Sequence, residues 1–414
     1  MKARRIVVVG GGAAGFFTAI NAAENCRAKD IPVDVRILEL SGQTLKKVKI
    51  SGGGRCNVTH HLFESRAFCE RYPRGAKELL SAFQRFQASD TVEWFLKRGV
   101  TLVAEADGRM FPDTNTSETI IQCFLDSAKN SNVQLHLNYK VETVRQQDDQ
   151  SFLVEVKNAE PLVADAVMIA TGSSAPGYQL AKTLGHTITE LAPSLFSFKV
   201  EDPLLHDLSG LSFENTEVKL LIPGQKPFAE SGPLLITHWG VSGPAVLKIS
   251  AWAAREMLHA DYKAELKVNW LGIKRLEDVL LILKRLRSEA VKSQIHNIYP
   301  EQLAKRFWVK ILAKAEVAED KRWGDISNKQ LQNLAEILFA SEFKVLGKNR
   351  FKDEFVECGG VALKEIDFKT MQSKICPGLY FAGEVIDVDG ITGGFNFQNA
   401  WTGAWIAAQD MAKT

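Results

Sequence analysis

The 414-residue chain contains no run of 18 consecutive apolar residues, so we expect no membrane-spanning helix. Its six cysteines, at positions 26, 56, 69, 123, 358 and 376, include no C-x-x-C pair. Their scatter argues against a disulfide framework, a zinc site and a dithiol redox motif, and it fits the reducing cytoplasm. The basic N-terminus meets only four apolar residues before three glycines, which is too short for the core of a signal peptide.

Two motifs of common enzyme classes are also missing. No G-x-S-x-G nucleophile turn occurs, and no H-x-x-x-H spacing indicates a metal site. The formal net charge is only +2, which gives no reason to expect a polyanion-binding protein as a whole. The segment 274–352 is less balanced, with 17 Lys or Arg against 10 Asp or Glu. We interpret this excess as a solvated helical face, and a patch for a phosphate-bearing partner is the alternative.

Apolar periodicity predicts alternating strands and helices in the first part of the chain. Ile6–Val9 is continuously apolar, as in a strand that is buried on both faces of a parallel sheet. A helix is expected over Ala13–Cys26 and a second strand over Val33–Leu38, which completes a strand–helix–strand unit. Further helices are expected over Thr91–Gly99 and Ser117–Ser127, and further strands over Gln134–Val141, Phe152–Val156 and Ala166–Ala170.

The pattern of the sequence changes twice after this region. From about Pro193, short alternating runs separated by glycine and proline predict a β-rich part. From Ile249 to about Leu338 the pattern is helical and charged. Strands are expected again after Gly359, and an apolar helix is expected over Ala400–Met411. The simplest topology is an α/β nucleotide-binding domain that an insertion interrupts and the C-terminal segment completes.

The string Gly10-Gly11-Gly12-Ala13-Ala14-Gly15 matches the dinucleotide fingerprint G-x-G-x-x-G, and it joins the first expected strand to the first expected helix. Gly10 permits the tight turn, Gly12 lets a pyrophosphate approach the backbone, and Gly15 lets the helix pack against the strand. The free N–H groups at the front of the helix attract the phosphates, as does the positive end of the helix dipole. We therefore predict contacts to a dinucleotide from Gly10, Gly12, Ala13, Ala14 and Gly15.

Glu39 lies at the end of the second expected strand, 24 residues after Gly15. A carboxylate at this position can accept hydrogen bonds from both ribose hydroxyls, and it repels a 2′-phosphate. We therefore expect Glu39 to favour FAD or NAD over NADP in this site.

Two later segments favour FAD over NAD. Ala170-Thr171-Gly172 ends a buried strand, as in many flavoproteins with two dinucleotide domains, and we place Thr171 and Gly172 near the cofactor. A second glycine-rich turn between a strand and a helix follows Leu379. Because FAD is a long ligand, such an element can clamp its ribityl and isoalloxazine end, which an NAD dehydrogenase does not need. The residues that we assign to this element are Gly383, Glu384, Asp387, Gly393, Gly394 and Asn396.

A second glycine cluster, Lys49-Ile50-Ser51-Gly52-Gly53-Gly54-Arg55-Cys56-Asn57, does not have the composition of a flexible linker. Successive backbone N–H groups at Ser51, Gly53 and Gly54 can form a concavity that binds an anion. We therefore predict that this segment also contacts the cofactor.

Four side chains of this cluster can add chemistry to it. Arg55 is expected to pair with a phosphate, with flavin O2 or N1, or with a substrate carbonyl, and Lys49 can serve similarly. Asn57 offers both a donor and an acceptor. A neighbouring arginine can lower the pKa of the Cys56 thiol, and a passive small residue is the other interpretation of this position.

These motifs together resemble the BaiN/RdsA-like family of FAD-dependent oxidoreductases, also called YhiN-like or the aminoacetone oxidase family. The likeness extends over nearly the whole chain. It implies a Rossmann-type FAD-binding domain (1–190 and 355–414), an inserted β-barrel-like domain (191–248 and 339–354) and a helical domain nested in it (249–338). It also implies FAD contacts at Val141 and Phe397. The strings that carry the resemblance are those quoted above together with Thr237-His238-Trp239-Gly240-Val241-Ser242-Gly243-Pro244-Ala245, Cys358-Gly359-Gly360-Val361 and Gly378–Asn399.

The resemblance implies hydride transfer from NAD(P)H, as a transient electron donor, through FAD to an activated C=C. The substrate is an unidentified small molecule or, as the alternative, a uridine in ribosomal RNA. A third interpretation is an FAD-bearing binding or sensor protein with little turnover. Reduction of a C=C also needs an acid that protonates the product, for which His238 and Cys56 are the candidates. For the RNA alternative, we expect a binding patch at Lys284, Arg285 and Arg287.

Overall fold

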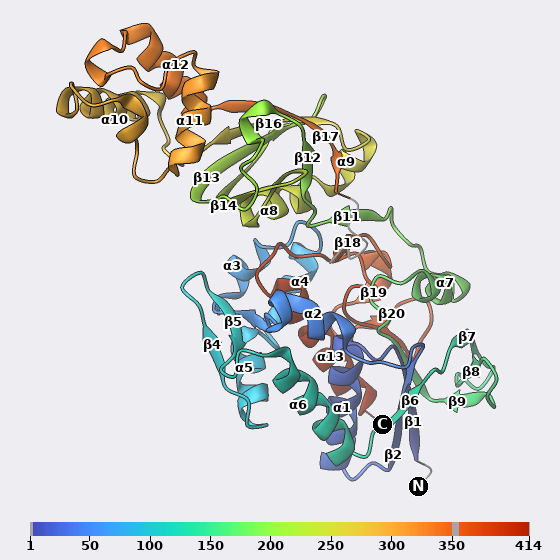
Figure 1. Cartoon of the computed structure of the whole chain (residues 1–414). Coiled ribbons are helices and arrows are strands. Elements are labelled where there is room, and N and C mark those ends of the chain that lie inside the picture. Colours follow the sequence, from blue (N-terminus) through green and yellow to red (C-terminus); the bar gives the residue numbers. More distant parts are fainter. Residues whose placement is uncertain (1–2, 350–355, 414) are drawn as a thin grey trace. The chain divides into compact units, whose positions relative to one another are not determined.

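The computed structural model describes residues 3–349 and 356–413 (Figure 1). The chain divides into two compact units. The first unit comprises Met1–Ala192 and Phe355–Thr414, and the second comprises Pro193–Glu354. Among the described residues, no helix is both long enough and apolar enough to cross a bilayer.

A seven-stranded sheet organises the first unit, in the order β19-β20-β21-β10-β1-β2-β6. Its centre is parallel, with β1 (Arg4–Val9) between β2 (Val33–Glu39) and β10 (Ala166–Ile169). Beyond β10 lies β21 (Leu379–Phe381), so segments from both ends of the chain share this sheet. The prediction of a Rossmann-type domain is confirmed. The outer strands are β6 (Gln134–Leu137), β19 (Ile366–Asp367) and β20 (Gln372–Ser373).

Two long helices pack against each other in this unit (Figure 1). The first, α1 (Ala13–Ala28), follows β1 directly, and α13 (Phe395–Met411) is the last helix of the chain. The ring centroids of Phe17 on α1 and Trp401 on α13 lie 5.3 Å apart. Because neighbours cover α1 on several sides, apolar residues surround it instead of forming one stripe. The other helices are α2 (Lys46–Gly54), α3 (Ser65–Cys69), α4 (Ala76–Phe83), α5 (Ala88–Leu96), α6 (Ser117–Asn130) and α7 (Ala175–Thr183).

The prediction of one strand over Gln134–Val141 is wrong. The chain turns at Asn138, which has a φ of 60°. Asparagine tolerates this left-handed conformation, and the alternation of apolar residues continues across it, so the break is hard to detect. After the turn, β7 (Val141–Gln146) belongs to a separate antiparallel sheet with β8 (Phe152–Val156) and β9 (Leu162–Ala164). A further small sheet contains β3 (Thr59–His60), β4 (Leu102–Ala104) and β5 (Arg109–Pro112), and β11 (Ala192–Ser194) pairs with β18 (Val356–Cys358).

Six strands form a closed barrel in the second unit, in the order β12-β15-β14-β13-β16-β17. The barrel-like insertion is confirmed, but the range 249–338 is not helical throughout, because β16 (Ala264–Asn269) is a barrel strand. The other barrel strands are β12 (Phe198–Val200), β13 (Ser212–Leu221), β14 (Phe228–Thr237), β15 (Gly240–Ser242) and β17 (Ser341–Lys348). The helices are α8 (Pro244–Trp252), α9 (Ala254–His259), α10 (Leu276–Glu289), α11 (Lys305–Lys314) and α12 (Asn328–Phe339).

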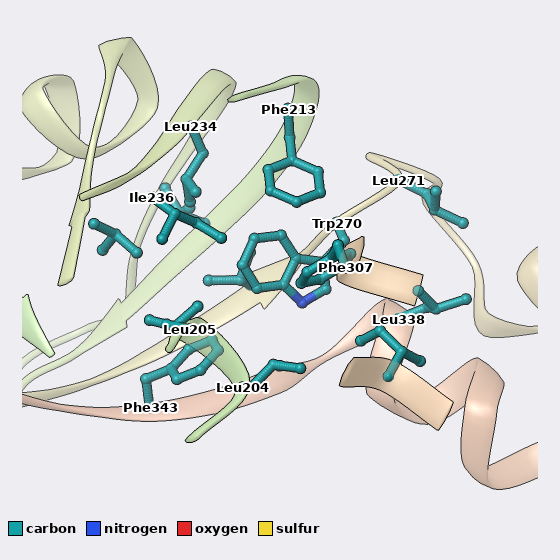
Figure 2. Close-up of a cluster of buried hydrophobic side chains, with 14 of the residues drawn as sticks. Leu204, Leu205, Phe213, Leu234, Ile236, Trp270, Leu271, Phe307, Leu338 and Phe343 are labelled. Carbon is teal, nitrogen blue, oxygen red and sulfur yellow. The ribbon is translucent and has the colours of Figure 1, made fainter. Parts of the chain in front are cut away.

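One hydrophobic core joins the barrel to the helices of the second unit. Figure 2 shows Trp270, just after β16, between barrel side chains and residues from the helical segments. Its ring centroid lies 4.7 Å from that of Phe213 on β13 and 4.7 Å from that of Phe307 on α11. The indole Nε1 donates to Ser341 Oγ at 2.9 Å, which satisfies the one polar atom of the ring. The helices therefore share their core with the barrel, and a separate helical domain stays a prediction.

Candidate functional site

The front of α1 has free backbone donors. The helix begins after Gly12, which is its N-cap residue and provides no capping side chain. No acidic residue lies in the first turn either. The first N–H groups of a helix have no partner within it, so those of Ala13 and Ala14 are available to a ligand. Together with the positive end of the helix dipole, they form an anion site.

The three fingerprint glycines have different surroundings. Gly10 has a φ of +112°, and a Cβ there would lie 2.5 Å from the carbonyl oxygen of Ala170. A Cβ on Gly15 would overlap the carbonyl oxygen of Gly10. A Cβ on Gly12 would meet nothing within 4 Å. Gly10 and Gly15 are therefore required by the fold itself, whereas Gly12 borders open space in which a pyrophosphate fits.

Glu39 is fixed beside this turn by three hydrogen bonds. Its Oε2 accepts from the backbone N–H of Gly11 at 2.8 Å. Its Oε1 accepts from the N–H and the hydroxyl of Ser41, at 2.9 Å and 2.8 Å. The carboxylate is thus held at the end of β2, next to the front of α1, and each of its oxygens can still accept from a ribose hydroxyl.

The second glycine-rich turn meets α1 at Gly383. A Cβ on Gly383 would lie 3.1 Å from the Cβ of Ala14 and 3.7 Å from that of Ala400. The end of β21 therefore lies against both α1 and α13. This close approach brings together elements from the two ends of the chain.

An ion pair that the sequence did not indicate adds α2 to this arrangement. Lys47 pairs with Glu384, and its ammonium also donates to Ser173 Oγ at 3.2 Å. A Cβ on Gly172 would lie 3.8 Å from the Glu384 carboxylate. The turn after β10, the start of α2 and the turn after β21 therefore converge. The buried Thr171 hydroxyl has no hydrogen-bond partner among the described residues, and a cofactor beside this turn could supply one.

A buried ion pair anchors the loop that follows Glu384. Asp389 has no exposed surface, and it pairs with Arg74, whose side chain is 14% exposed. Asp387 in the same loop is also buried. Neither Arg74 nor Asp389 belongs to the predicted set, because residues so far apart in sequence give no local pattern.

The side chain of Asn396 forms hydrogen bonds within its own loop. Its amide nitrogen donates to the carbonyl of Gly390 at 2.9 Å, and its oxygen accepts from the N–H of Gly390 at 2.8 Å. Both side-chain atoms therefore close the loop between β21 and α13. Asn396 thus shapes the glycine turn that contains Gly393 and Gly394, and its contact with the cofactor stays a prediction.

The second glycine cluster gives an irregular end to α2. Gly52 and Gly53 have left-handed backbone conformations with φ of +57° and +69°. A Cβ on Gly53 or Gly54 would meet nothing within 4 Å, so the backbone at these two residues borders open space, whereas a Cβ on Gly52 would lie 2.9 Å from the ring of Phe111. This geometry agrees with the predicted anion-binding concavity. The side chain of Lys49 is exposed, and its partner stays a prediction.

Arg55, the predicted partner of a phosphate, the flavin or a substrate carbonyl, also pairs with an acid of the chain. Its Nη1 donates to Glu105 Oε1 at 2.7 Å, and its guanidinium lies 3.9 Å from the ring centroid of Phe111. Glu105 is 50 residues away, so the sequence could not reveal this pairing. The side-chain amide of Asn57 lies between the carbonyl of Thr59 and the N–H of Gly394, 3.0 Å from each. Asn57 therefore links the cluster to the start of α13.

The whole chain matches one protein family. The model described as HI0933-like protein Rossmann domain matches residues 4–410. The chain belongs to this HI0933-like family. It is 30% identical to the ribosomal RNA dihydrouridine synthase of Escherichia coli strain K12, over 98% of this chain and 97% of that protein. It is 26% identical to the 3-dehydro-bile acid delta(4,6)-reductase of Clostridium scindens, with 99% of each chain covered.

Two solved steroid dehydrogenases have a similar fold. The 3-ketosteroid delta1-dehydrogenase from Sterolibacterium denitrificans gives a TM-score of 0.52 at 10% identity, over 98% of this chain and 99% of that chain. The 3-ketosteroid-delta4-(5alpha)-dehydrogenase from Rhodococcus jostii gives 0.50 at 12% identity, over 99% and 97%. At such identities the likeness concerns the fold alone. Membership of the HI0933-like family and the dinucleotide-binding geometry identify the chain as an FAD-dependent oxidoreductase.

Cys56 is enclosed in this HI0933-like fold. Its side chain has no exposed surface, and burial raises the pKa of its thiol to about 12. This shift is opposite to the lowering that a neighbouring arginine suggested. A buried, protonated thiol does not suit an acid or a nucleophile that must reach substrate at neutral pH.

We predict that Cys56→Ala lowers turnover by no more than about twofold, because the thiol remains protonated and enclosed. Iodoacetamide should leave Cys56 unmodified in the native protein at pH 8 and label it in urea, as peptide mass spectrometry would measure. Rapid labelling of the native protein, or loss of most turnover in Cys56→Ala, would restore Cys56 as a catalytic candidate.

Three other predicted residues do not lie in the turn after β10, the start of α2 or the turn after β21. Val141 is buried at the start of β7, and the ring of Phe397 stacks on Trp401 with 5.5 Å between centroids. His238 belongs to the second unit, where it is exposed in the turn between β14 and β15. Its role as a proton donor stays a prediction.

Proposed function

We propose that this protein reduces a C=C conjugated to a carbonyl, with hydride that passes from NAD(P)H through FAD, and that its substrate is a uridine in ribosomal RNA. The observation that carries the FAD assignment is the meeting of the open front of α1, the fixed carboxylate of Glu39 and the Gly383 turn. The substrate rests on the curated relatives. One is named for making dihydrouridine in ribosomal RNA and another for reducing a bile acid. Both names describe the addition of hydrogen to a C=C.

The cofactor would lie along the glycine-rich elements of the first unit. The N–H groups at the front of α1 would hold its pyrophosphate, and Glu39 would accept from the ribose hydroxyls. Bound FAD supplies a ring that accepts hydride and donates it to an electron-poor carbon. The full set of proposed contacts is Gly10, Gly12, Ala13, Ala14, Gly15, Glu39, Lys49, Ser51, Gly53, Gly54, Arg55, Cys56, Asn57, Val141, Thr171, Gly172, Gly383, Glu384, Asp387, Gly393, Gly394, Asn396 and Phe397.

The protein must also orient the substrate and move a proton. Lys47 holds Glu384 in place, and this pair links the start of α2 to the turn after β21. The buried pair of Arg74 and Asp389 does the same for the loop that precedes α13. His238, which is exposed in the turn between β14 and β15, would supply the proton that completes the reduction.

An anaerobic stopped-flow experiment tests this function. The holoprotein is mixed with NADH or NADPH, and the expected result is bleaching of the flavin absorbance well above the buffer rate. The reduced protein is then mixed with ribosomal RNA that lacks dihydrouridine. The flavin should reoxidise, and digestion of the RNA should yield dihydrouridine by mass spectrometry.

The other outcomes identify the alternatives. No bleaching by either nucleotide would overturn the NAD(P)H linkage and favour the sensor interpretation. Bleaching followed by reoxidation with a small enone, such as a conjugated ketosteroid, but not with RNA would replace uridine by a small-molecule substrate.

A further inference from the structure

Helix α11 has a basic outer face. Its sequence, Lys-Arg-Phe-Trp-Val-Lys-Ile-Leu-Ala-Lys, contains four cations and no acid. Phe307, Trp308, Ile311 and Leu312 have no exposed surface and fix the rotation of the helix against the core of the second unit. At 3.6 residues per turn, Arg306 and the half-buried Lys310 lie on the side opposite these residues, and Lys305 and Lys314 lie at its two edges. We call these four cations the α11 basic face.

The neighbouring helix α10, in contrast, has balanced charges. Glu277 and Asp278 lie in its first turn, where acids stabilise the helix dipole. Arg285 pairs with Glu289 at 2.8 Å, and Arg287 donates to Asn328 Oδ1 at 2.9 Å. Two of the three cations that the sequence assigned to an RNA patch thus have local partners. This is the pattern of a solvated helical face.

The α11 basic face has fewer acidic partners than α10. Lys305 and Arg306 lie at the start of the helix, where a positive charge opposes the helix dipole, and no acid occupies its first turn. Within residues 3–349 and 356–413, neither Arg306 nor Lys310 has an acidic side chain within 4 Å. Lys305 donates only to the neutral Asn297 amide, and Lys314 lies 3.9 Å from Asp202. The uncompensated charge destabilises the free helix slightly, which indicates an anionic partner.

We propose that the α11 basic face binds the sugar–phosphate backbone of RNA. The inference rests on the proposed RNA substrate and names the surface that holds it. Arg306, Lys310 and Lys314 extend over about 12 Å of the helix axis, which gives a line of charge of the kind that a phosphate backbone attracts. The exposed Ala313 and half-buried Val309 leave little bulk between the cations. Such contacts position an RNA and carry no sequence information, so they would present a target uridine that other residues select.

The test uses the double variant R306A/K310A in the full-length holoprotein. Fluorescence anisotropy measures binding of a labelled ribosomal RNA fragment at several salt concentrations. Each lost phosphate contact lowers the slope of log K against log salt by about 0.7 to 0.9, so the slope should fall by about 1.4 to 1.8. Affinity near physiological salt should fall about tenfold or more. Flavin absorbance and the melting temperature check that the variant folds.

Two controls separate this surface from general charge and from the proposed function. K129A/K226A removes the same charge from α6 and from the turn before β14 and should bind RNA as the wild type does. K284A/R285A tests the α10 patch and should have a smaller effect than R306A/K310A. If the wild type binds RNA and R306A/K310A has an unchanged slope of log K against log salt, the α11 basic face does not bind RNA. The proposed function is then unaffected. If the wild type itself binds no RNA, both the surface and the uridine substrate are overturned.

Discussion

Gly12→Ala is expected to give a folded protein that purifies with little or no FAD. Gly12 has a φ of −94°, which an alanine adopts without strain, and its Cβ would contact no protein atom within 4 Å. The methyl group would instead occupy the space in which the pyrophosphate approaches the front of α1. We expect FAD affinity to fall at least about 100-fold, or roughly 3 kcal/mol, because both the close approach and the amide hydrogen bonds are lost.

Fluorescence titration of the apoprotein with FAD measures this loss, and thermal melting of the apoprotein measures stability. The matched control is Gly42→Ala in the loop after β2. The added Cβ would lie 3.5 Å from Asn138 Oδ1, an ordinary contact, and the three fingerprint glycines stay unchanged. This variant should keep wild-type affinity. A Gly12→Ala protein with wild-type affinity would show that the pyrophosphate lies elsewhere.

Arg74→Ala is expected to destabilise the protein strongly. It leaves the Asp389 carboxylate, which has no exposed surface, without its cation. Breaking a buried ion pair by removing one partner costs about 3 to 5 kcal/mol of unfolding free energy, because a buried charge is left uncompensated. Urea unfolding measures this cost. FAD retention should also fall, since Asp389 belongs to the loop that leads to Gly393 and Gly394.

Arg74→Ala has two controls. One is a double variant that removes both charges of the buried pair, and the other is a single variant in a partly exposed ion pair. Arg74→Leu combined with Asp389→Leu removes both charges and should cost less than Arg74→Ala alone. Arg36→Ala removes the cation from the ion pair of Arg36 and Asp34, in which the two side chains are 31% and 27% exposed. It should lower the free energy of unfolding by no more than about 1 kcal/mol. A loss for Arg74→Ala as small as that for Arg36→Ala would contradict the anchoring role of the buried pair.

Local patterns in the sequence predicted the elements that local physics determines. The unit of β1, α1 and β2 was visible because a buried strand, three glycines and an apolar helix follow one another directly. The β-rich part after Pro193 was visible through its short alternating runs, which overlap three of the six barrel strands, β12, β13 and β14. The strand β16 was missed because Ala264–Asn269 lies between charged helices and carries two charges itself. The turn at Asn138 was missed because one residue with positive φ left the apolar alternation intact.

The candidate site was predictable in its backbone and not in its ion pairs. The glycines of the Gly10–Gly15 motif and Gly383 indicate where the backbone packs closely against another segment or a ligand. Each of them can be recognised in the sequence without knowledge of a distant partner. The partners of Lys47, Arg55 and Arg74 lie 337, 50 and 315 residues away in sequence. The sequence around a charged side chain does not indicate the distant acid with which it pairs.

The visible absorption spectrum of the purified wild-type protein, with the ratio of flavin to polypeptide after reconstitution, is the most direct test of the FAD assignment. One FAD per chain, with the yellow absorbance of oxidised flavin, is the predicted result. A protein that stays colourless after incubation with excess FAD and separation from the free cofactor would contradict the account.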